Sequence, residues 1–345
     1  MSLSIAITKR KPFGAKSRRD KLFIESRPFR SPPKSIVTYV PIMSEVERTI
    51  SGALNWGSRL LKERGIESPR MDAELLLRKA LSIDQVKLYL FSHRALTQLQ
   101  FASYKSLINK RIRGEPIQYI LGRREFWSLD LKVTPKVFIP RPETELVVEE
   151  ALKIFREARS PTLRFMEVGT GSGAIAVALA KEMEGCFIVA EDVSWEAIVL
   201  ARENAEIHGV SGNIRFLVGD LFSALKEAKC PFDLIISNPP YIPSSRIGTL
   251  PREIAEFEPR IALDGGPDGL QCIGKIVMGS RSFLKDGGWL MLELGERQGD
   301  AIAEMIRNAG FFESPSITKD YSGADRVIRA RKGPSGCDER GVSFG

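Results

Sequence analysis

The sequence predicts an α/β protein in which a small all-helical region precedes a larger domain built on a parallel β-sheet. Three observations support this fold class. Leucine-rich helical patterns occupy residues 43–115, short apolar runs alternate with helical patterns from Pro142 onward, and a glycine-rich turn follows the first of those runs. Strands that alternate with helices indicate a parallel sheet covered on both faces. The 345 residues are sufficient for both parts.

The first 42 residues differ in composition from the rest of the chain. They hold ten Lys or Arg against two acids, which accounts for the whole formal net charge of +8. We expect this basic, serine- and proline-containing segment to be disordered. Three interpretations compete: an organellar transit peptide, a basic interaction tail, or an over-extended start before the true initiator Met43, which we favour. The remaining chain is balanced in charge, unlike a dedicated duplex-binding protein.

Residues 43–115 are predicted to form a small helical domain. Ser44 and Glu47 match a capping box, Ser68 precedes a proline at a second helix start, and Thr97 opens a further helix. The leucine stripes of these helices indicate a packed core and not a ligand site.

The segments that follow predict a linker and then the α/β domain. Apolar residues alternate over residues 116–140, which predicts a β-hairpin linker. Residues 141–332 are expected to form the α/β domain, and residues 333–345 a flexible tail. The expected strands are Leu163–Val168, Phe187–Ala190, Ile214–Val218, Leu234–Ile236 and Trp289–Leu294. The expected helices are Glu143–Ala158, Ala174–Glu182, Trp195–His208, Gln271–Leu284 and Gln298–Ala309.

Composition excludes several classes of protein. No apolar run is long enough to cross a membrane. The four cysteines are scattered without paired spacing and the two histidines lie far apart, so we expect no metal site. These features are typical of a cytoplasmic protein in a reducing compartment.

A glycine-rich loop follows the first expected strand and opens a helix. Its sequence is Gly169-Thr170-Gly171-Ser172-Gly173. Glycines allow a tight turn and a close approach of a ligand to the backbone, with helix-terminal N–H groups directed at it. The spacing G-x-G-x-G differs from the G-x-G-x-x-G of dinucleotide-binding loops. A glycine loop alone is weak support for a binding site, because many such loops are only turns.

Acidic and aromatic residues at the next two strand ends extend the candidate binding site. Asp192 ends the second strand about 20 residues beyond the loop, where a carboxylate commonly binds ribose hydroxyls. Its neighbour Glu191 is the competing candidate, and we favour Asp192. At the end of the third strand, Asp220 could accept a hydrogen bond from an adenine amino group. Phe222 could lie against the adenine ring or belong simply to the core.

The fourth strand ends in the tetrapeptide Asn238-Pro239-Pro240-Tyr241. Parallel strands present their carboxyl ends to the ligand crevice, so the tetrapeptide should face the glycine loop. An amide nitrogen is a poor nucleophile because its lone pair is delocalised. The Asn238 side-chain oxygen and the Pro239 carbonyl can accept its N–H groups, and Tyr241 offers a flat wall. Methyl transfer to a planar nitrogen would then need positioning and electrostatics alone. The simpler alternative is that the prolines only end a strand.

With these motifs the chain resembles the release factor glutamine N5-methyltransferase family, also called the HemK family. Tetrapeptides of this kind also occur in DNA and RNA N-methyltransferases. Two further segments are more specific to the family: Pro140-Arg141-Pro142-Glu143-Thr144-Glu145 and Ala262-Leu263-Asp264-Gly265-Gly266. The resemblance extends from about residue 43 to residue 331.

The resemblance implies a Rossmann-like, seven-stranded class I methyltransferase domain that uses S-adenosylmethionine. It implies that a helical domain docks class I peptide chain release factors, whose Gly-Gly-Gln glutamine is methylated, and that the protein is cytoplasmic. By the family pattern, the glycine loop, Asp192, Phe222 and Asn238 line the donor, and Asn238 to Tyr241 hold the glutamine. We expect a monomer with no direct nucleic-acid substrate.

Some residues depart from the pattern or have no assigned role. Glu167 stands where aspartate is commoner and Phe222 where tryptophan also occurs, and both changes keep the side chain's character. Arg141, Glu143 and Glu145 are adequately explained as a helix start. Glu293, at the end of a core strand, has no role in this interpretation.

Two alternative functions are retained. The first is an N-methyltransferase that acts on a nucleobase amino group, which usually requires an added recognition region. The second is a binding module that keeps the fold without turnover, and no sequence feature favours it.

Overall fold

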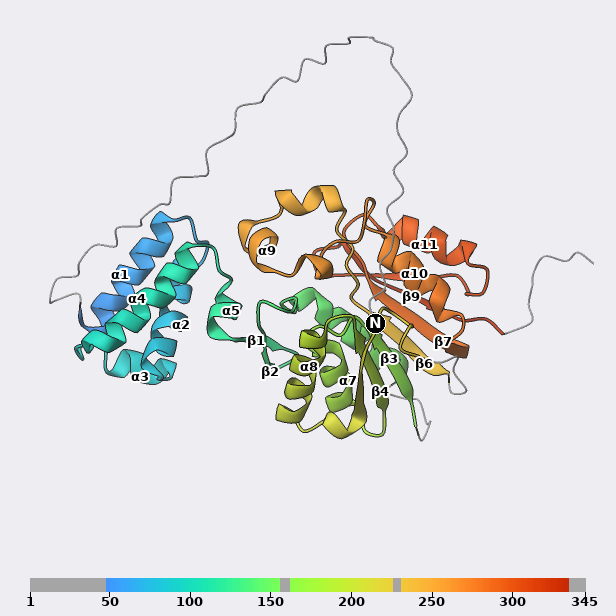
Figure 1. Cartoon of the computed structure of the whole chain (residues 1–345), viewed down its shortest axis with the longest axis horizontal. Coiled ribbons are helices and arrows are strands. Elements are labelled where there is room, and N and C mark those ends of the chain that lie inside the picture. The colour runs from blue at the N-terminus through green and yellow to red at the C-terminus, as the bar shows by residue number, and fades with distance from the viewer. Residues whose placement is uncertain (1–47, 156–161, 226–230, 335–345) are drawn as a thin grey trace, which may run out of the picture. The chain divides into compact units, whose positions relative to one another are not determined.

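The computed structural model describes residues 48–155, 162–225 and 231–334, and its elements are labelled in Figure 1. Five helices come first: α1 (Ile50–Glu63), α2 (Pro69–Leu81), α3 (Gln85–Leu90), α4 (Gln98–Ile112) and α5 (Ile117–Leu121). The antiparallel strands β1 (Arg123–Phe126) and β2 (Leu129–Lys132) follow. Everything after them belongs to the α/β domain.

The helical region starts and packs largely as its sequence predicts. Thr97 caps α4 in a complete capping box with Gln100. Pro69 occupies the first turn of α2, although the Ser68 side chain makes no cap hydrogen bond. The first helix begins at Ile50 behind a Thr49 cap. The predicted capping box of Ser44 and Glu47 lies outside the described residues.

Aromatic and aliphatic side chains fill the core of the helical region. Trp56, Leu61 and Tyr104 are buried, and the ring of Trp56 meets that of Phe101 at a centroid distance of 5.3 Å. A Cβ atom at Gly57 would lie 2.0 Å from the Tyr104 hydroxyl, so glycine permits the close approach of α1 and α4. The leucine stripes therefore form a core, as the sequence predicts.

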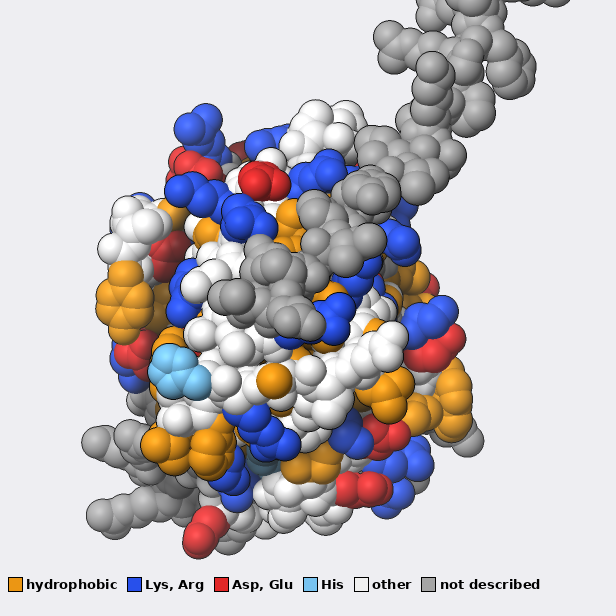
Figure 2. Space-filling model, turned by 90° about the vertical axis from the view of Figure 1, so that its left-hand side faces the viewer, with side chains coloured by type: hydrophobic (Ala, Val, Ile, Leu, Met, Phe, Trp, Pro, Cys, Tyr) orange, Lys and Arg blue, Asp and Glu red, His pale blue; other side chains and the backbone are white. Residues whose placement is uncertain are grey.

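The outer surface of this region leaves several apolar side chains exposed. Met71, Val86, Leu90 and Leu99 are each more than half exposed, at 57%, 74%, 70% and 83%. Figure 2 views the side on which Figure 1 labels α1 to α4, and hydrophobic side chains reach the surface there beside Lys and Arg. Monomeric proteins seldom leave large apolar groups clustered at the surface without an interaction role.

The hairpin is shorter than expected. It spans residues 123–132, and the short helix α5 occupies the start of the segment in which the alternation predicted strand. Trp127 and Ser128 form the turn with positive φ angles of 53° and 56°. Leu131 and Val133 of the alternating segment nevertheless lie in the interior.

The α/β domain contains a seven-stranded sheet in the order β5-β4-β3-β6-β7-β9-β8. Five strands are parallel: β3 (Arg164–Val168), β4 (Phe187–Asp192), β5 (Ile214–Val218), β6 (Phe232–Ser237) and β7 (Leu284–Glu293). The strands β8 (Ser316–Lys319) and β9 (Asp325–Arg331) close the edge, with β9 antiparallel to both neighbours. The five predicted strands are confirmed, whereas no apolar run predicts β8 and β9.

Helices cover the sheet on both faces. The helical elements are η2 (Pro142–Thr144), α6 (Glu145–Phe155), α7 (Ala174–Glu182), α8 (Trp195–Ile207), η3 (Ser211–Asn213), η4 (Ser244–Thr249), α9 (Arg252–Phe257), η5 (Arg260–Ala262), α10 (Gln271–Ser280) and α11 (Gly299–Asn308). One core contains side chains from α6 and α7, and the other contains side chains from α10 and α11. Successive strand residues point to opposite faces, so Phe165 enters the first core and Met166 the second.

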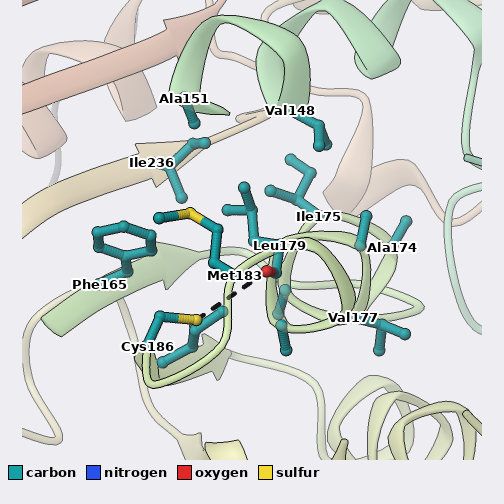
Figure 3. Close-up of a cluster of buried hydrophobic side chains, with 14 of the residues drawn as sticks. Val148, Ala151, Phe165, Ala174, Ile175, Val177, Leu179, Met183, Cys186 and Ile236 are labelled. Atoms are coloured by element: carbon teal, nitrogen blue, oxygen red, sulfur yellow. Dashed lines mark hydrogen bonds between the residues drawn. The ribbon is translucent and has the colours of Figure 1, made fainter. Parts of the chain in front are cut away.

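The first of these cores is shown in Figure 3. Val148 and Ala151 of α6, with Leu179 of α7, lie over Phe165 and the other sheet residues drawn there. Cys186 is buried within this core, and its thiol contacts the Leu179 carbonyl at 4.0 Å. Its burial raises the pKa of the thiol to about 11. This cysteine therefore behaves as a small hydrophobic residue.

Candidate active site

The glycine-rich loop turns directly after β3 and leads into α7. Gly169 and Gly171 have φ angles of 73° and 55°, which side chains with a Cβ atom rarely adopt. A Cβ atom at either position would meet no neighbouring atom, so both glycines border open space on the ligand side. The loop therefore presents exposed backbone where a ligand can approach closely.

A buried carboxylate beneath the loop fixes its shape. Glu167 accepts hydrogen bonds from the Thr170 hydroxyl at 2.6 Å and from the Ala176 backbone N–H at 3.1 Å. Burial raises the pKa of Glu167 to about 8, and these two donors oppose the increase. Glu167 thus connects the loop to the first turn of α7 through these two hydrogen bonds.

Asp192 lies at the end of β4 and holds the loop from the other side. One carboxylate oxygen accepts from the Gly171 N–H at 2.8 Å and the other from the Ser194 N–H at 2.9 Å. Burial raises the pKa of Asp192, against the effect of these two N–H groups. Each carboxylate oxygen can accept a second hydrogen bond, so the ribose-binding role predicted for Asp192 is compatible with these contacts.

Glu191, the competing candidate, is more deeply placed. Its side chain is 1% exposed, and its Oε1 atom has no hydrogen-bond partner among the described residues. Burial, together with the charge of Asp192, raises the pKa of Glu191 to about 8. Backbone N–H groups oppose the increase in pKa at both acids, those of Gly169 and Leu221 at Glu191 and those of Ser194 and Gly171 at Asp192.

Two predicted donor-binding residues lie away from the cavity wall. Phe222 stacks on Phe283 with a centroid distance of 5.0 Å and an interplanar angle of 7°, and a Cβ atom at Gly279 would lie 2.5 Å from it. Leu221, with a φ angle of 56°, faces the cavity in its place. Gly173 packs against Ala201 of α8 and is likewise absent from the wall. Phe222 is half-buried and packs on Phe283, and its contact with the donor stays a prediction.

The tetrapeptide follows β6 and faces the glycine loop, as predicted. Asn238 is half-buried, and its side-chain nitrogen donates to the Thr144 hydroxyl at 3.1 Å. Because the nitrogen is engaged by Thr144, the side-chain oxygen remains available to a ligand in the cavity. Thr144 is 3% exposed and comes from η2, 94 residues earlier in the chain.

Tyr241, at the other end of the tetrapeptide, contacts a second buried acid. Its hydroxyl donates to Glu293 Oε1 at 3.3 Å, and Glu293 is 1% exposed at the end of β7. The Tyr241 carbonyl accepts from the Gln298 side chain at 2.9 Å. The ring is therefore held at its hydroxyl as well as along its backbone.

A glycine-rich segment supports the backbone of the tetrapeptide. The Ile242 N–H donates to the Leu263 carbonyl at 3.0 Å, and the Gly265 N–H donates to the Ile242 carbonyl at 2.9 Å. A Cβ atom at Gly265 would lie 2.7 Å from the Pro240 carbonyl oxygen, and one at Gly269 would lie 2.3 Å from the Tyr241 carbonyl oxygen. Only glycine permits this backbone-to-backbone contact.

The segment that precedes α6 does more than start a helix. Arg141 forms an ion pair with Glu258, and its guanidinium lies 4.6 Å from the Phe138 ring centroid. Glu145 accepts from the Trp127 backbone N–H in the hairpin turn at 2.8 Å. These contacts connect the hairpin, η2 and the segment after α9, so the helix-start interpretation accounts for only part of this motif.

These residues surround one cavity of about 350 Å³. Its wall includes the loop residues Gly169 to Ser172, the acids Glu191 and Asp192, and the whole tetrapeptide Asn238 to Tyr241. The volume is typical of a pocket for a small molecule. In this cavity the open backbone of the glycine loop lies next to the polar Asn238 and the flat ring of Tyr241. This arrangement suits a nucleoside-containing donor beside a planar acceptor.

The described residues offer no alternative centre for metal chemistry. No group of three or more His, Cys, Asp or Glu in this part of the chain is arranged to hold a metal ion. In the same part of the chain, no helix is long and apolar enough to cross a membrane.

The fold and the cavity together define a class I methyltransferase. Residues 52–122 match the PrmC N-terminal domain family, and residues 159–314 match the Methyltransferase domain family. The Geobacter sulfurreducens release factor glutamine methyltransferase is 43% identical over 286 residues, which cover 83% of this chain and 97% of that protein. The Salmonella typhimurium protein of the same name is 41% identical over 79% of this chain and 95% of its own length. The chain belongs to the release factor glutamine methyltransferase family.

Solved structures include proteins with the same fold. The hMettl16 catalytic domain, in complex with a MAT2A 3′UTR hairpin, has a TM-score of 0.51 at 15% identity and covers 76% of this chain and 94% of its own. The protein-(glutamine-N5) methyltransferase (release factor-specific) from Alicyclobacillus acidocaldarius is 32% identical, with a TM-score of 0.35, over 57% of this chain and 95% of its own.

Proposed function

We propose that this enzyme transfers the methyl group of S-adenosylmethionine to the side-chain amide nitrogen (N5) of the glutamine in the Gly-Gly-Gln motif of class I peptide chain release factors. The observation that carries the proposal is the orientation of Asn238. Its nitrogen is engaged by Thr144, and its oxygen is left to accept an N–H from a planar acceptor in the cavity. The membership of the family supports the same acceptor.

The cradle fits S-adenosylmethionine. The donor would lie along Gly169 to Ser172, where open space borders the glycines, with its ribose at Asp192 and its adenine beside Asp220 and Leu221. When bound, it supplies an electrophilic methyl group on a sulfonium. Phe222, which is half-buried and stacks on Phe283, stays a predicted neighbour of the adenine.

The residues of this chain act on the acceptor amide. Asn238 Oδ1 and the Pro239 carbonyl accept the two N–H groups, which orients the nitrogen lone pair toward the methyl carbon. Transfer would form the N–C bond as the C–S bond breaks, with the bonding pair left on the donor, so that positive charge would develop on the nitrogen. The two oxygens stabilise this charge, and one N–H proton then passes to solvent. The flat ring of Tyr241 restricts rotation of the amide plane, which keeps the nitrogen lone pair aligned with the methyl carbon.

We infer that the helical domain docks the release factor. Exposed apolar side chains on this domain support the inference, because they offer contact surface outside its own core. They are Met71, Val86, Leu90 and Leu99, each more than half exposed. We further infer that the enzyme works as a monomer, without a nucleic-acid substrate, in the cytoplasm where release factors act.

A methyl-transfer assay with tritiated donor tests the acceptor. The acceptors to compare are a purified release factor, the same factor with the motif glutamine replaced by alanine, total RNA and DNA. We expect label on the intact release factor alone. Label on RNA or DNA with none on the factor would instead favour the nucleobase methyltransferase.

A further inference from the structure

The two ends of the tetrapeptide are held by residues from distant parts of the chain. Asn238 donates to Thr144 at 3.1 Å, and Tyr241 donates to Glu293 at 3.3 Å. Thr144 and Glu293 are 3% and 1% exposed, so neither is a surface group that solvent could replace. Both belong to segments to which the sequence alone assigns no chemical role.

We propose that Thr144 and Glu293 are positioning residues that form one relay, in which a single carboxylate fixes the orientation of both Asn238 and Tyr241. In this relay the Asn238 amide donates to the Thr144 hydroxyl, the Thr144 hydroxyl donates to Glu293, and the Tyr241 hydroxyl donates to the same carboxylate. The inference rests on the proposed function, because it gives the relay its purpose: to keep the Asn238 oxygen toward the acceptor amide.

The proton inventory supports the Thr144–Glu293 link. A threonine hydroxyl has one proton to donate, and its oxygen is already occupied as the acceptor of the Asn238 N–H. That proton requires an acceptor in a buried setting. Glu293 Oε2 has no partner among the described residues, and hydrogen bonding from Thr144 is the strongest effect that lowers the pKa of Glu293. The unpaired oxygen is thus the natural recipient.

The relay matters because the two ends of an asparagine amide have nearly the same shape. A rotation of 180° about the last bond would point N–H groups, instead of the oxygen, toward the substrate's own N–H groups. With Thr144 committed as a donor to Glu293, its oxygen accepts only, and only the Asn238 nitrogen can pair with it. The relay therefore excludes the unproductive orientation.

The charges around Glu293 make the relay sensitive to pH. Burial, with a smaller contribution from Glu143, raises the pKa of Glu293 to about 7, against the lowering effects of Thr144, Arg326 and Tyr241. Arg326 is itself paired with Asp320 at 2.9 Å, so it does not neutralise Glu293 alone. Below neutrality a protonated Glu293 can donate to Thr144, which would free the Thr144 hydroxyl to turn toward Asn238. Turnover should therefore decline as pH falls through about 7.

The matched variants are Thr144→Val, which keeps the shape and removes the hydroxyl, and Thr144→Ser, which keeps the hydroxyl. We expect Thr144→Val to lower the single-turnover rate at saturating donor by about ten- to one-hundred-fold, with Thr144→Ser restoring most of it. Donor affinity should change much less than the rate in both variants, because Thr144 contacts the tetrapeptide through Asn238. Equal rates for Thr144→Val and the wild type would overturn the proposal.

Glu293→Gln tests the carboxylate by its pH profile. The wild-type rate should rise with pH around 7, and the variant's profile should be flat across the same range. A variant that keeps the wild-type pH dependence would show that another group titrates, and the relay would be refuted.

An NMR measurement separates this inference from the proposed function. In protein labelled with ¹⁵N-asparagine, the Asn238 side-chain signal is identified by its loss in Asn238→Ala. We expect that signal to shift with pH with a midpoint near 7 in the wild type and to lose the shift in Thr144→Val. This readout requires no methyl acceptor, so it holds even if the release factor is not the substrate. An Asn238 side-chain chemical shift that does not change with pH would contradict the relay while leaving the proposed function intact.

Discussion

The substitution Gly265→Ala should disturb the tetrapeptide without touching any ligand-binding side chain. The added Cβ atom would lie 2.6 Å from the Gly269 carbonyl oxygen and 2.7 Å from that of Pro240. Ordinary contacts begin at 3.4 Å, so the Pro240 carbonyl would have to recede by about 0.7 Å. Both neighbours are backbone atoms, which cannot rotate away. Overpacking of this kind costs about 1–3 kcal/mol of stability.

The same displacement should lower the rate of methyl transfer as well as stability. A shift approaching 1 Å at a positioned group can cost about 10²-fold in rate, and Pro240 lies between the proposed acceptor Pro239 and Tyr241. We expect a fall in melting temperature of about 2–4 °C per kcal/mol lost, with a loss in single-turnover rate of about tenfold or more. Differential scanning calorimetry and rapid-quench assays measure the two effects.

Gly212→Ala is the matched control, because an added Cβ atom there meets no neighbour within 4 Å and its φ angle lies outside the left-handed region. It should leave both quantities unchanged. If Gly265→Ala behaves like Gly212→Ala, the glycine segment does not determine the position of the tetrapeptide and the steric reasoning is wrong.

Three further predictions test other parts of the molecule. Asp192→Ala should weaken donor affinity by about ten- to one-hundred-fold in calorimetry, whereas Glu191→Gln should change it much less; the reverse order would assign the ribose to Glu191. Arg141→Ala removes the partner of a buried carboxylate, and we expect a loss of about 1–3 kcal/mol in the free energy of unfolding, below the 3–5 kcal/mol of fully buried pairs because Arg141 is partly exposed. The pKa of Glu258 is already raised by burial and should rise further without Arg141, so the deficit should be largest above the pKa of Glu258 in the variant and shrink as pH falls from there to its pKa in the wild type; a deficit that is constant with pH would exclude the ion pair as its cause. Deleting residues 43–115 should preserve donor binding but raise the release factor concentration needed for half-maximal rate, and an unchanged requirement would contradict the docking role.

The parallel core of the fold could be predicted because its signals are local. Four of the five predicted strands are apolar runs with both faces largely buried, and such runs are visible without knowledge of their neighbours. The fifth, β5, is a mostly apolar run at the edge of the sheet. The strands β8 and β9 could not be recognised in the same way, for a physical reason. Ser316–Lys319 is a short edge strand with polar ends, and Asp325–Arg331 alternates arginines with apolar residues, so neither forms a continuous apolar run.

The site could be predicted where residues act close to their own motif. The glycine loop, Asp192 and the tetrapeptide all line the cavity or its edge because each ends a strand of one sheet. Thr144 and Glu293 could not be found in this way. Their roles depend on contacts with Asn238 and Tyr241 that lie 94 and 52 residues away in sequence. Neither the residue types nor their spacing in the sequence indicates that Thr144 contacts Asn238 or that Glu293 contacts Tyr241.

Phe222 is a residue for which the sequence left two roles open. An aromatic residue two positions after a strand-ending acid suits an adenine pocket, but the positive φ angle of Leu221 turns the chain so that Phe222 stacks on Phe283. Sequence patterns do not reveal such a turn at a leucine, since positive φ angles are uncommon for this residue type.

Mass spectrometry of the acceptor tests the proposed methyl transfer most directly. A release factor is incubated with the enzyme and S-adenosylmethionine, and the peptide that carries Gly-Gly-Gln is fragmented to locate any added mass. We predict one added CH₂ unit on the side chain of the motif glutamine, and none over the same period with the Asn238→Ala variant. An unmodified glutamine beside a methylated residue elsewhere, or full modification by Asn238→Ala at the wild-type rate, would contradict this mechanism.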